Sequence, residues 1–458
     1  MKYLYAVLYI YLLVGCSQKE IVPLTPIEQI KVDKPTTSVK KTLIKVKKVE
    51  KKDDFLKDLL LYPQHIEVYT KDINNSYIST QKKFEKKYFR VWNIDNMSVP
   101  LNDAMWAYKV FTSKNSYGEN LKKIDSSFFD QIKIESDFKN YSTINKRAIS
   151  LYNLNIRAFP TDNPVFMNPT KAGEGFPFDY MQNSTIAPNK PLFVSHYSKS
   201  KKWVFIESSF AFGWVKAKDI AFIDKKYTDM WQKAKQVFLL CDDEKIYTED
   251  KKFLFDTRVG MLLPLINEID DGYNVLTISA FKHKAYYHSS YIPKNIASIG
   301  IIEHNEKNIN KVINGMKYTK YGWGGLFNQR DCSSTLRDFF IPFGVWLPRN
   351  SHKQSLSGEV ISLDGLTKSE KIKIIKSKAI PFRTLLYKRG HIALYIGVRD
   401  DNVMIFQNVW GVKTKIDKQE GRYIIGKSVF STLEIGKELR YFYKNSSMLS
   451  QLKSMSIF

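Results

Sequence analysis

The pattern of apolar and polar residues divides the chain into segments of different character. Residues 55–147 are polar with scattered aromatic residues at helical spacing, which predicts a helical segment that packs on its neighbours. Residues 148–225 and 226–298 instead show short apolar runs, such as Trp203–Glu207, between turns rich in Gly, Pro, Asn and Ser. This spacing is typical of short strands, so we predict two consecutive small β-barrels.

The last segment, residues 299–458, combines helical and strand patterns. A helix is predicted at Glu306–Met316, and a longer one begins near Cys332. Two strong strand runs follow at His391–Val398 and Val403–Trp410, joined by a short polar loop that predicts a β-hairpin. The segment is therefore predicted to be an α+β domain.

The start of the chain has the pattern of an export signal over residues 1–15. Lys2 precedes an apolar stretch, Leu4–Val14, that is too short to span a bilayer comfortably. The stretch ends in Leu13-Val14-Gly15-Cys16, which resembles the lipobox of bacterial lipoproteins. That resemblance implies cleavage before Cys16 and a diacylglycerol on its thiol. An ordinary signal peptide with a chance cysteine is the alternative.

The residues after this signal predict a tether and a location. Residues 16–54 contain many Lys, several Pro and few aromatic residues, which is typical of a flexible linker. Ser17, directly after Cys16, resembles the residue that sorts lipoproteins to an outer membrane. We therefore expect an exported protein, lipid-anchored on the periplasmic side of the cell envelope at the outer membrane.

The chain is strongly basic, with 71 Lys and Arg against 46 Asp and Glu and a formal net charge of +25. No helix-turn-helix, zinc or RNA-binding signature accompanies this charge, so nucleic acid is not expected as a partner. Anionic surfaces are plausible electrostatic partners. A lysine-rich surface without a specific partner explains the charge equally well.

The three cysteines, Cys16, Cys241 and Cys332, cannot form a disulfide framework. With Cys16 acylated, two thiols remain in an oxidising compartment, where unpaired thiols are unusual. Cys241 ends the apolar run Val237–Cys241 and is predicted to be a core residue of a strand. No group of His and Cys has metal-ligand spacing, so neither a metal nor another cofactor is expected. Cys332 needs a different explanation.

Cys332 is predicted to open a helix. Asp331 is a good N-cap residue, and Leu336, Phe339 and Phe340 recur behind Cys332 at helical spacing. A thiol at the first helical position feels the positive end of the helix dipole and nearby backbone N–H groups, which lower its pKa. The same N–H groups can hold the oxyanion of a tetrahedral intermediate. On these features alone, a buried structural cysteine is an equal alternative.

His391 and Gln407 are predicted to face each other across the hairpin. A hairpin centred near residue 400 pairs residues whose numbers total about 798 to 801. An even total puts His391 and Gln407 on the same face, whereas an odd total turns Gln407 away. On the same face, Gln407 can hold the imidazole while the other ring nitrogen meets Cys332, which is the thiol counterpart of a serine triad.

Two nearby residues are weaker candidates for these roles. Asn408 is adjacent to Gln407 and faces the opposite side of the strand, so only one of the two can orient the imidazole. His352 follows a loop with no strand pattern, which makes it a poor alternative to His391 as the base.

Three motifs resemble the signatures of NlpC/p60 cell-wall cysteine peptidases, in that family's order and at its spacings. They are Tyr321-Gly322-Trp323-Gly324-Gly325, Asp331-Cys332-Ser333-Ser334 and Gly390-His391-Ile392-Ala393-Leu394-Tyr395-Ile396-Gly397. Asn155–Thr161 and Gly175–Tyr180 resemble the first bacterial SH3-like domain of multidomain members. Those members carry a helical N-terminal segment, two SH3-like barrels and a terminal peptidase domain. The resemblance therefore implies a papain-like α+β fold for residues 299–458.

The resemblance also implies an activity. It is hydrolysis of the γ-D-glutamyl–meso-diaminopimelate bond in peptidoglycan stem peptides, through a Cys thiolate and an acyl-enzyme. Cys332 would be the nucleophile, His391 the general base and then the general acid, and Gln407 the residue that orients the imidazole. In the family this third residue is often His and sometimes Asn or Gln, so Gln407 departs from the common residue but stays within the family's range. A neutral amide stabilises imidazolium less than a carboxylate does, which is consistent with modest activity.

Three further residues take roles from the same resemblance. Tyr321 resembles the tyrosine whose hydroxyl assists the oxyanion, although an aromatic packing residue is the alternative. Asp331 resembles the residue that binds the free amine of L-Ala, and Ser333 its neighbour in substrate binding. Asp331 can also serve as the helix N-cap. We expect a monomer whose partners are peptidoglycan stem peptides and, through the lipid anchor, a membrane.

Other functions stay open from the sequence. One is a wall-binding lipoprotein with a decayed peptidase fold, which the intact Cys332 and His391 disfavour. Another is an amidase or acyl transferase that uses the same thiol site. Acid–base glycosidase chemistry lacks support, because the Asp and Glu pairs of the barrels show no convergent arrangement.

Overall fold

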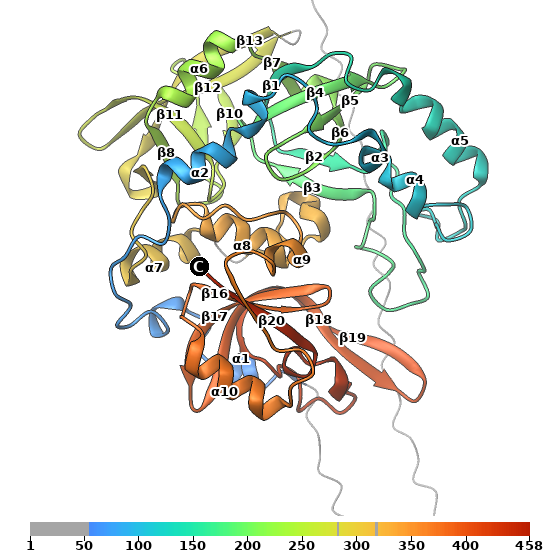
Figure 1. Cartoon of the computed structure of the whole chain (residues 1–458), viewed down its shortest axis with the longest axis vertical. Helices are drawn as coiled ribbons and strands as arrows, with labels where there is room; N and C mark the ends of the chain where they lie inside the picture. Colours follow the sequence, from blue (N-terminus) through green and yellow to red (C-terminus); the bar gives the residue numbers. More distant parts are fainter. Residues whose placement is uncertain (1–54, 282–283, 317–318) are drawn as a thin grey trace, which may run out of the picture. The chain divides into compact units, whose positions relative to one another are not determined.

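The computed structural model describes residues 55–281, 284–316 and 319–458 (Figure 1). The predicted export signal at residues 1–15, the predicted lipidation residue Cys16 and the predicted tether at residues 16–54 lie outside the described residues. None of the helices in the described ranges has the length and apolarity needed to cross a membrane.

Short helices form the first described part of the chain, as the sequence predicts. They are α1 (Asp58–Leu61), α2 (Gln81–Tyr88), α3 (Leu101–Ala104), α4 (Trp106–Val110) and α5 (Ser126–Glu135), with 3-10 turns η1 (Ile66–Val68), η2 (Arg90–Asn93) and η3 (Phe138–Asn140). Phe84 and Tyr88 lie one turn apart on α2 and are buried. The Phe84 ring centroid is 5.8 Å from that of Phe238, which belongs to the second β-domain. The helical segment therefore shares its core with its neighbours.

The next two parts are built from short strands, as predicted. The first contains β1 (Lys146–Ser150), β2 (Leu154–Arg157), β3 (Gln182–Ile186), β4 (Pro191–Tyr197), β5 (Trp203–Glu207), β6 (Phe212–Lys216), η4 (Ala217–Asp219) and β7 (Ile220–Phe222). The second contains α6 (Lys225–Lys233), β8 (Gln236–Leu239), β9 (Lys245–Tyr247), β10 (Phe253–Asp256), β11 (Leu262–Glu268), β12 (Gly272–Phe281), β13 (Lys284–Pro293), η5 (Lys294–Ile296) and β14 (Ala297–Ile299).

The two β-domains are not separate sheets. In the described residues their strands form one twelve-stranded sheet, in the order β14-β8-β11-β12-β13-β7-β1-β4-β5-β6-β2-β3, and β9 pairs with β10 apart from it. The link between the two domains is a parallel pair between Lys284 of β13 and Phe222 of β7. This continuity joins segments distant in the sequence, so the local strand pattern could not reveal it.

Cys241 differs from its prediction. It lies beyond the end of β8 rather than in the strand, and it is only half-buried. Its sulfur contacts the backbone oxygen of Asp242 at 3.5 Å and Glu244 Oε1 at 3.8 Å. The strand ends at Leu239, because the chain turns away there toward polar residues, so the apolar run overstated the length of the strand.

The C-terminal part is the predicted α+β domain. Its elements are α7 (Glu306–Gly315), η6 (Trp323–Asn328), α8 (Cys332–Phe340), α9 (Ser351–Gln354), β15 (Glu359–Ser362), α10 (Lys368–Lys378), β16 (Thr384–Lys388), β17 (His391–Arg399), β18 (Asn402–Ile416), β19 (Gln419–Thr432), η7 (Lys444–Ser446), α11 (Met448–Gln451) and β20 (Leu452–Ile457). The described strands form an antiparallel sheet in the order β15-β20-β16-β17-β18-β19.

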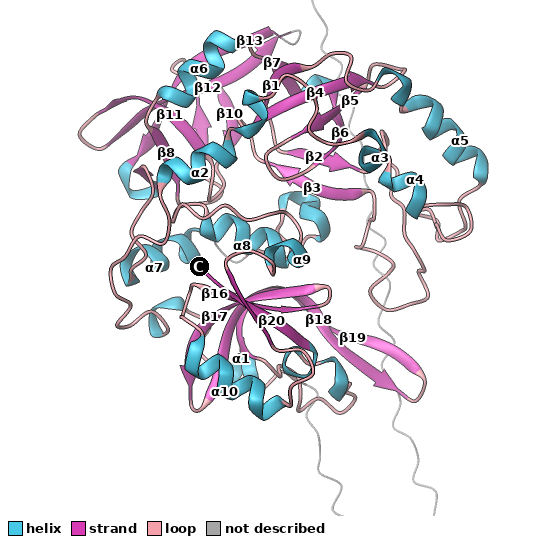
Figure 2. Cartoon of the chain, viewed as in Figure 1, coloured by secondary structure: helices cyan, strands magenta, loops and turns pink. Residues whose placement is uncertain are grey.

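Helices cover both faces of this sheet (Figure 2). Ile392 and Leu394 of β17 pack in one apolar cluster with Leu336 of α8. Ala393 and Tyr395, the alternate residues of the same strand, pack in a second cluster with Ile375 of α10. The strand is buried on both faces, which explains why it reads as a continuous apolar run in the sequence. The arrangement places the start of α8 over the middle strands of the sheet.

Candidate active site

Cys332 is the first residue of α8, as predicted, and the helix start is well fixed. The Asp331 carboxylate accepts a hydrogen bond from the Ser334 amide at 2.8 Å, and the Ser334 hydroxyl accepts one from the Asp331 amide at 2.9 Å. This capping box satisfies two backbone donors at the helix start. Leu336 and Phe339 are fully buried and hold the helix on the sheet. The thiol therefore has a defined position.

The environment of Cys332 raises its pKa rather than lowering it. Burial, with the Asp331 charge adding to it, raises the pKa of Cys332 to about 12. Hydrogen bonds from the backbone of Ile392 and Ser333 lower the pKa, as predicted for a helix start, but they are the smaller effect. The prediction of a lowered pKa was therefore wrong for the resting chain, because only 8% of the residue is exposed. A base must remove the thiol proton.

The hairpin brings His391 and Gln407 together. A register shift between Tyr395 and Gly397 changes the pairing of β17 with β18. Beyond the shift Leu394 lies opposite Phe406, so the numbers of paired residues have an even total. This register puts His391 and Gln407 on one face, and His391 Nε2 lies 2.7 Å from Gln407 Oε1. The backbone of Ile392, the residue after His391, hydrogen-bonds the Cys332 sulfur. The start of β17 therefore lies beside the nucleophile candidate.

A chain of hydrogen bonds determines which nitrogen of His391 carries its proton. Ser431 Oγ donates to the backbone oxygen of Thr432 at 3.1 Å, so it accepts from Gln407 Nε2 at 2.7 Å. The amide oxygen of Gln407 is then the atom that faces His391, and His391 must donate through Nε2. This tautomer leaves Nδ1 of His391 with a lone pair that can accept a proton from a thiol.

The charge state of His391 suits a base. Burial lowers the pKa of His391 to about 4, and the Lys388 charge lowers it further, while the bond to Gln407 and the Asp331 charge oppose this. The imidazole is therefore neutral at neutral pH. A neutral imidazole can accept the proton of a thiol when the sulfur attacks, so this chemistry does not require a pre-formed ion pair.

Tyr321 lies against the residues that precede Cys332. Its backbone forms a parallel bridge with Arg330, and its ring centroid is 5.9 Å from that of Trp410. Burial raises the pKa of Tyr321 well above its ordinary value, and the charge of Asp331 acts in the same direction. The hydroxyl is therefore a neutral donor close to the thiol. Whether it serves the oxyanion or only packs stays a prediction.

Arg349 holds Asp331 and Ser333, which the sequence assigns to substrate binding. Arg349 Nη2 donates to Asp331 Oδ2 at 2.6 Å, and Nη1 donates to Ser333 Oγ at 2.9 Å. Arg349 Nε also donates to Ser184 Oγ of the first β-domain at 2.7 Å. Sequence reasoning missed Arg349, since it lies beyond the motif and no local pattern links it to Asp331. The substrate roles of Asp331 and Ser333 stay predictions.

The first β-domain borders the site with aromatic residues. The ring centroid of Phe178 lies 5.3 Å from that of Trp323 and 5.7 Å from that of Trp410. Its loop is held by Asp179, whose Oδ2 accepts from Arg157 Nη1 at 2.6 Å in a buried ion pair. Phe178 belongs to the segment Gly175–Tyr180 that the family resemblance singles out, but its contact with the peptidase domain was not predicted.

Two glycines of the Tyr321–Gly325 motif permit this close approach. Gly324 and Gly325 have φ of +59° and +87°, a region that residues with a Cβ rarely adopt. A Cβ on Gly324 would collide with the backbone oxygen of Gln182, and one on Gly325 would collide with Thr185. These glycines are therefore needed where β3 packs against the peptidase domain.

The two weaker candidates do not reach the thiol–imidazole pair. Asn408 Nδ2 donates to the backbone oxygen of Arg330 at 2.9 Å, so this side chain faces away from His391. His352 is exposed on α9, and its ring centroid lies 5.9 Å from that of Tyr387. In residues 55–281, 284–316 and 319–458, no three His, Cys, Asp or Glu side chains are grouped so that they could hold a metal ion.

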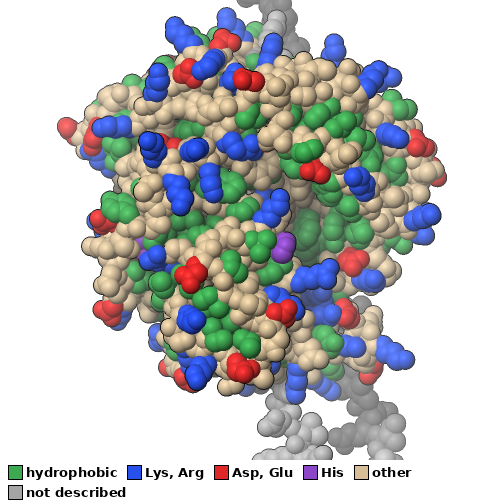
Figure 3. All heavy atoms as spheres, in the orientation of Figure 1, with side chains coloured by type: hydrophobic (Ala, Val, Ile, Leu, Met, Phe, Trp, Pro, Cys, Tyr) green, Lys and Arg blue, Asp and Glu red, His purple; other side chains and the backbone are tan. Residues whose placement is uncertain are grey.

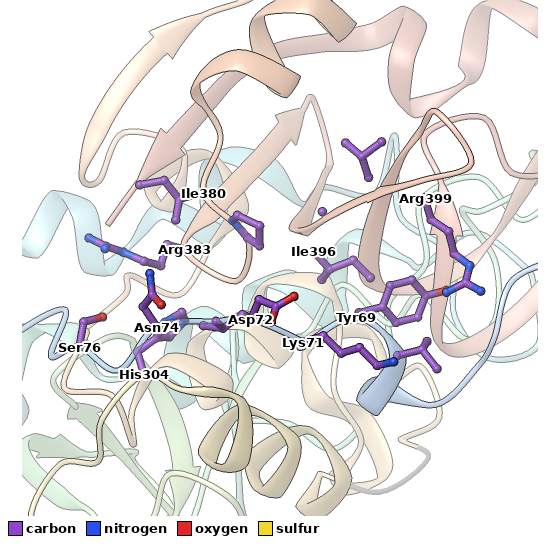
Figure 4. Close-up of a pocket in the computed structure, with 15 residues that line it drawn as sticks. Tyr69, Lys71, Asp72, Asn74, Ser76, His304, Ile380, Arg383, Ile396 and Arg399 are labelled. Carbon is purple, nitrogen blue, oxygen red and sulfur yellow. The ribbon is translucent and has the colours of Figure 1, made fainter.

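A cavity of about 520 Å³ lies at the other end of β17 (Figure 4). Its walls include Tyr69 and Asp72 of the helical segment and Arg383 and Arg399 of the peptidase domain. Cys332, His391 and Gln407 are not among its described lining residues. Its size alone therefore does not make it the site of thiol chemistry.

Four family models match the chain. The model described as the NLPC_P60 stabilising domain, N term, matches residues 5–141, and the NlpC/P60 family model matches residues 318–431. An SH3 domain of SH3b1 type matches residues 164–216, and one of SH3b2 type matches residues 224–268. The order is that of the multidomain proteins which the sequence resembles. The finer domain boundaries stay predictions.

The fold is also found in a solved structure. The chain is similar to a structure reported as a novel NlpC/P60 endopeptidase from Photobacterium damselae subsp. piscicida, with 23% identity, a TM-score of 0.73 and coverage of 87% of this chain and 96% of that one. A structure of an NlpC/P60 family protein from Bacillus cereus ATCC 10987 also matches, with 15% identity, a TM-score of 0.43 and coverage of 68% and 98%. No curated protein matches the chain. The first likeness shows that the fold is shared over most of both chains.

Proposed function

Because this chain is a multidomain protein of the NlpC/P60 family, we propose that it is a cysteine endopeptidase of peptidoglycan stem peptides. The bond that we propose is the γ-D-glutamyl–meso-diaminopimelate bond. The observation that carries the proposal is the hydrogen bond of 2.7 Å from His391 Nε2 to Gln407 Oε1, where the backbone of the next residue, Ile392, hydrogen-bonds the Cys332 sulfur. It leaves Nδ1 as the proton acceptor beside a thiol.

The proposed reaction begins with attack by the Cys332 sulfur on the γ-carbonyl carbon of the D-glutamyl residue. The thiol proton passes to Nδ1 of His391 as the sulfur–carbon bond forms. Negative charge then develops on the carbonyl oxygen, where the first N–H groups of α8 and the Tyr321 hydroxyl can donate hydrogen bonds. Because the thiol is neutral at rest, its proton must transfer during the attack itself.

The second half of the reaction releases both products. The tetrahedral intermediate collapses, the carbon–nitrogen bond breaks, and His391 returns its proton to the leaving amine of diaminopimelate. A water molecule then attacks the thioester while His391 accepts one of its protons. The thioester breaks, Cys332 regains its proton, and a free γ-carboxylate leaves. Gln407 keeps the ring oriented in both halves and does not exchange protons.

The products of a defined muropeptide test this proposal. The full chain is incubated with L-Ala-γ-D-Glu-meso-diaminopimelate-D-Ala, and the products are identified by mass. We expect L-Ala-γ-D-Glu and a diaminopimelate–D-Ala dipeptide. Cleavage at another bond would contradict the proposed specificity and favour the amidase alternative. Binding to peptidoglycan sacculi without any product would favour the wall-binding alternative.

We also propose that the protein is exported and lipid-anchored through Cys16 at the periplasmic side of the outer membrane. The support is the sequence from Lys2 to Ser17, with its short apolar stretch and its lipobox-like end. Cells expressing the chain are grown with labelled palmitate and then fractionated. We expect label on the protein in the outer-membrane fraction, and loss of the label in Cys16→Ala. Equal labelling of both proteins would contradict the anchor.

A further inference from the structure

A group of buried charges gathers around Asp338 of α8. Its members are cationic and acidic side chains from the two β-domains and the peptidase domain, and in the described residues the cations outnumber the carboxylates. The cations are Lys190, Arg258, Arg330, Arg337 and Arg349, and the carboxylates are Asp242, Asp331 and Asp338. Unlike the Lys and Arg side chains on the surface (Figure 3), these groups have little contact with water.

Asp338 is the centre of the group, and its oxygens are already occupied. Oδ2 accepts from Arg258 Nε and from Arg330 Nε at 2.8 Å each, and Oδ1 accepts from Arg337 Nη2 at 3.1 Å. Burial alone would raise the pKa of Asp338, but the three guanidinium groups hold it well below its ordinary value. Asp338 therefore stays charged, and three guanidinium groups share its two oxygens.

Lys190 forms no ion pair with a carboxylate in the described residues, although the charge of Asp338 favours its ammonium form. Only 5% of this residue is exposed, and among the described residues its Nζ makes no hydrogen bond or ion pair. Its contacts are aromatic: Nζ lies 3.2 Å from the ring centroid of Tyr88 and 5.7 Å from that of Phe210. Burial lowers the pKa of Lys190 well below its ordinary value, and the charge of Arg337 lowers it further. A buried ammonium without an anion is costly.

Arg337 shares the same aromatic neighbour and also has an unused donor. Its guanidinium carbon lies 3.8 Å from the ring centroid of Phe210. Its Nε is buried and has no hydrogen-bond partner among the described residues. Lys190 and Arg337 thus approach one ring, and each has a donor that no acceptor in the described part of the chain uses. This arrangement is unfavourable unless another group supplies negative charge.

A small cavity lies between these donors. It has a volume of about 20 Å³, and both Lys190 and Arg337 line it. Arg258 and Arg349 line it as well, and Asp338 is the one carboxylate among its described lining residues. A cavity needs roughly 10–15 Å³ to hold one water molecule. The space is therefore sufficient for a single small particle and too small for a phosphate or an organic acid.

We propose that this cavity is a binding site for one monatomic anion of the halide class, which in solution is chloride. Lys190 Nζ and Arg337 Nε would donate to it. The anion would link the first β-domain, which supplies Lys190, to α8, which supplies Arg337 five residues after Cys332. The proposal concerns the stability of this junction and does not depend on the proposed peptidase activity.

Anomalous scattering from bromide tests the site directly. Crystals of the full chain are soaked in sodium bromide, because bromide replaces chloride and scatters anomalously. We expect a peak in the cavity at hydrogen-bonding distance from Lys190 Nζ and Arg337 Nε. A cavity that holds only water or is empty in these crystals would overturn the proposal and assign a neutral amine to Lys190.

Thermal unfolding in different sodium salts gives a second test in solution. Sodium chloride or bromide is compared with sodium gluconate at equal ionic strength, because gluconate is too large for the cavity. A ligand that binds only the folded chain raises its Tm, here by roughly 2–4 °C.

We expect this rise in Tm in the wild type and its loss in Lys190→Met. The control variant Lys201→Met, which removes an exposed lysine of the same domain, should keep the rise. An equal Tm in all salts, or a rise that Lys190→Met retains, would overturn the proposal. If Lys190→Met does not fold, the bromide experiment decides alone.

Discussion

Gln407 donates its amide Nε2–H to Ser431 Oγ over 2.7 Å, and this contact determines which atom of Gln407 meets His391. Ser431 uses its own proton on the backbone oxygen of Thr432, so it can only accept from Gln407. The Gln407 oxygen therefore faces His391 Nε2 at 2.7 Å. A glutamine can present either end of its amide, and here a neighbouring strand selects the end that makes Nε2 of His391 the donor and leaves Nδ1 as an acceptor.

This selection predicts the effect of removing the Ser431 hydroxyl. In Ser431→Ala the Gln407 amide loses the acceptor that orients it, so the His391 tautomer is less firmly held. We expect kcat to fall by about 10-fold with little change in KM. A 10-fold change corresponds to the net free energy of one ordinary hydrogen bond. Ser428→Ala is the matched control, because the Ser428 hydroxyl lies on the same strand, is buried and has no described partner. Equal activity of Ser431→Ala and the wild type would contradict the role of Ser431.

The low pKa of His391 predicts a broad pH range of activity. The base is competent when neutral, so activity should persist as the pH falls and be lost only near the pKa of about 4. In Gln407→Glu the added carboxylate favours imidazolium and raises the pKa of His391, so the acid limb should move to higher pH. The measurement is kcat/KM against pH for both proteins. A wild-type acid limb near pH 6.5, or no displacement in the variant, would contradict this prediction.

The position of Tyr321 predicts a loss in the chemical step alone. Tyr321→Phe keeps the ring that packs on Trp410 and removes only the hydroxyl. If the hydroxyl donates to the oxyanion, kcat should fall by about 10²–10³-fold while KM stays similar. Thermal unfolding of the variant serves as the control for packing. A kcat equal to that of the wild type would make Tyr321 a packing residue only.

The buried pair of Arg157 and Asp179 predicts a structural effect in the loop that carries Phe178. Arg157→Met leaves the Asp179 carboxylate, which is 8% exposed, without its cation. We expect the free energy of unfolding to fall by about 3–5 kcal/mol in urea titrations. Lys225→Met removes the partner of Asp229 in an exposed pair and should cost less than about 0.5 kcal/mol. Similar losses in both variants would contradict this account of the buried pair.

The parts of the site that were predictable from the sequence are local ones. Asp331 before a helical apolar pattern predicts the helix start at Cys332, and the short hairpin loop limits the registers that could put His391 and Gln407 on one face. Both depend on residues within a few positions of each other or across one tight turn. The even register was left open, because the shift between Tyr395 and Gly397 has no clear sequence signal.

The parts that were not predictable join distant segments. Arg349 reaches Asp331 and also Ser184, and Ser431 reaches Gln407 from the next strand. The raised pKa of Cys332 has the same origin, because burial depends on how α8 packs against the whole sheet and not on its own residues. The helix start therefore predicted that nearby backbone N–H groups lower the pKa of Cys332. It could not predict that burial raises this pKa by more.

The most direct test of the central claim is the turnover of a γ-D-glutamyl–diaminopimelate muropeptide by Cys332→Ala and Cys241→Ala, compared with the wild type. If Cys332 is the nucleophile, Cys332→Ala should lose activity by roughly 10⁴-fold or more. Cys241→Ala, which changes the other described thiol, should keep wild-type activity. Release of L-Ala-γ-D-Glu by Cys332→Ala at the wild-type rate would contradict the account.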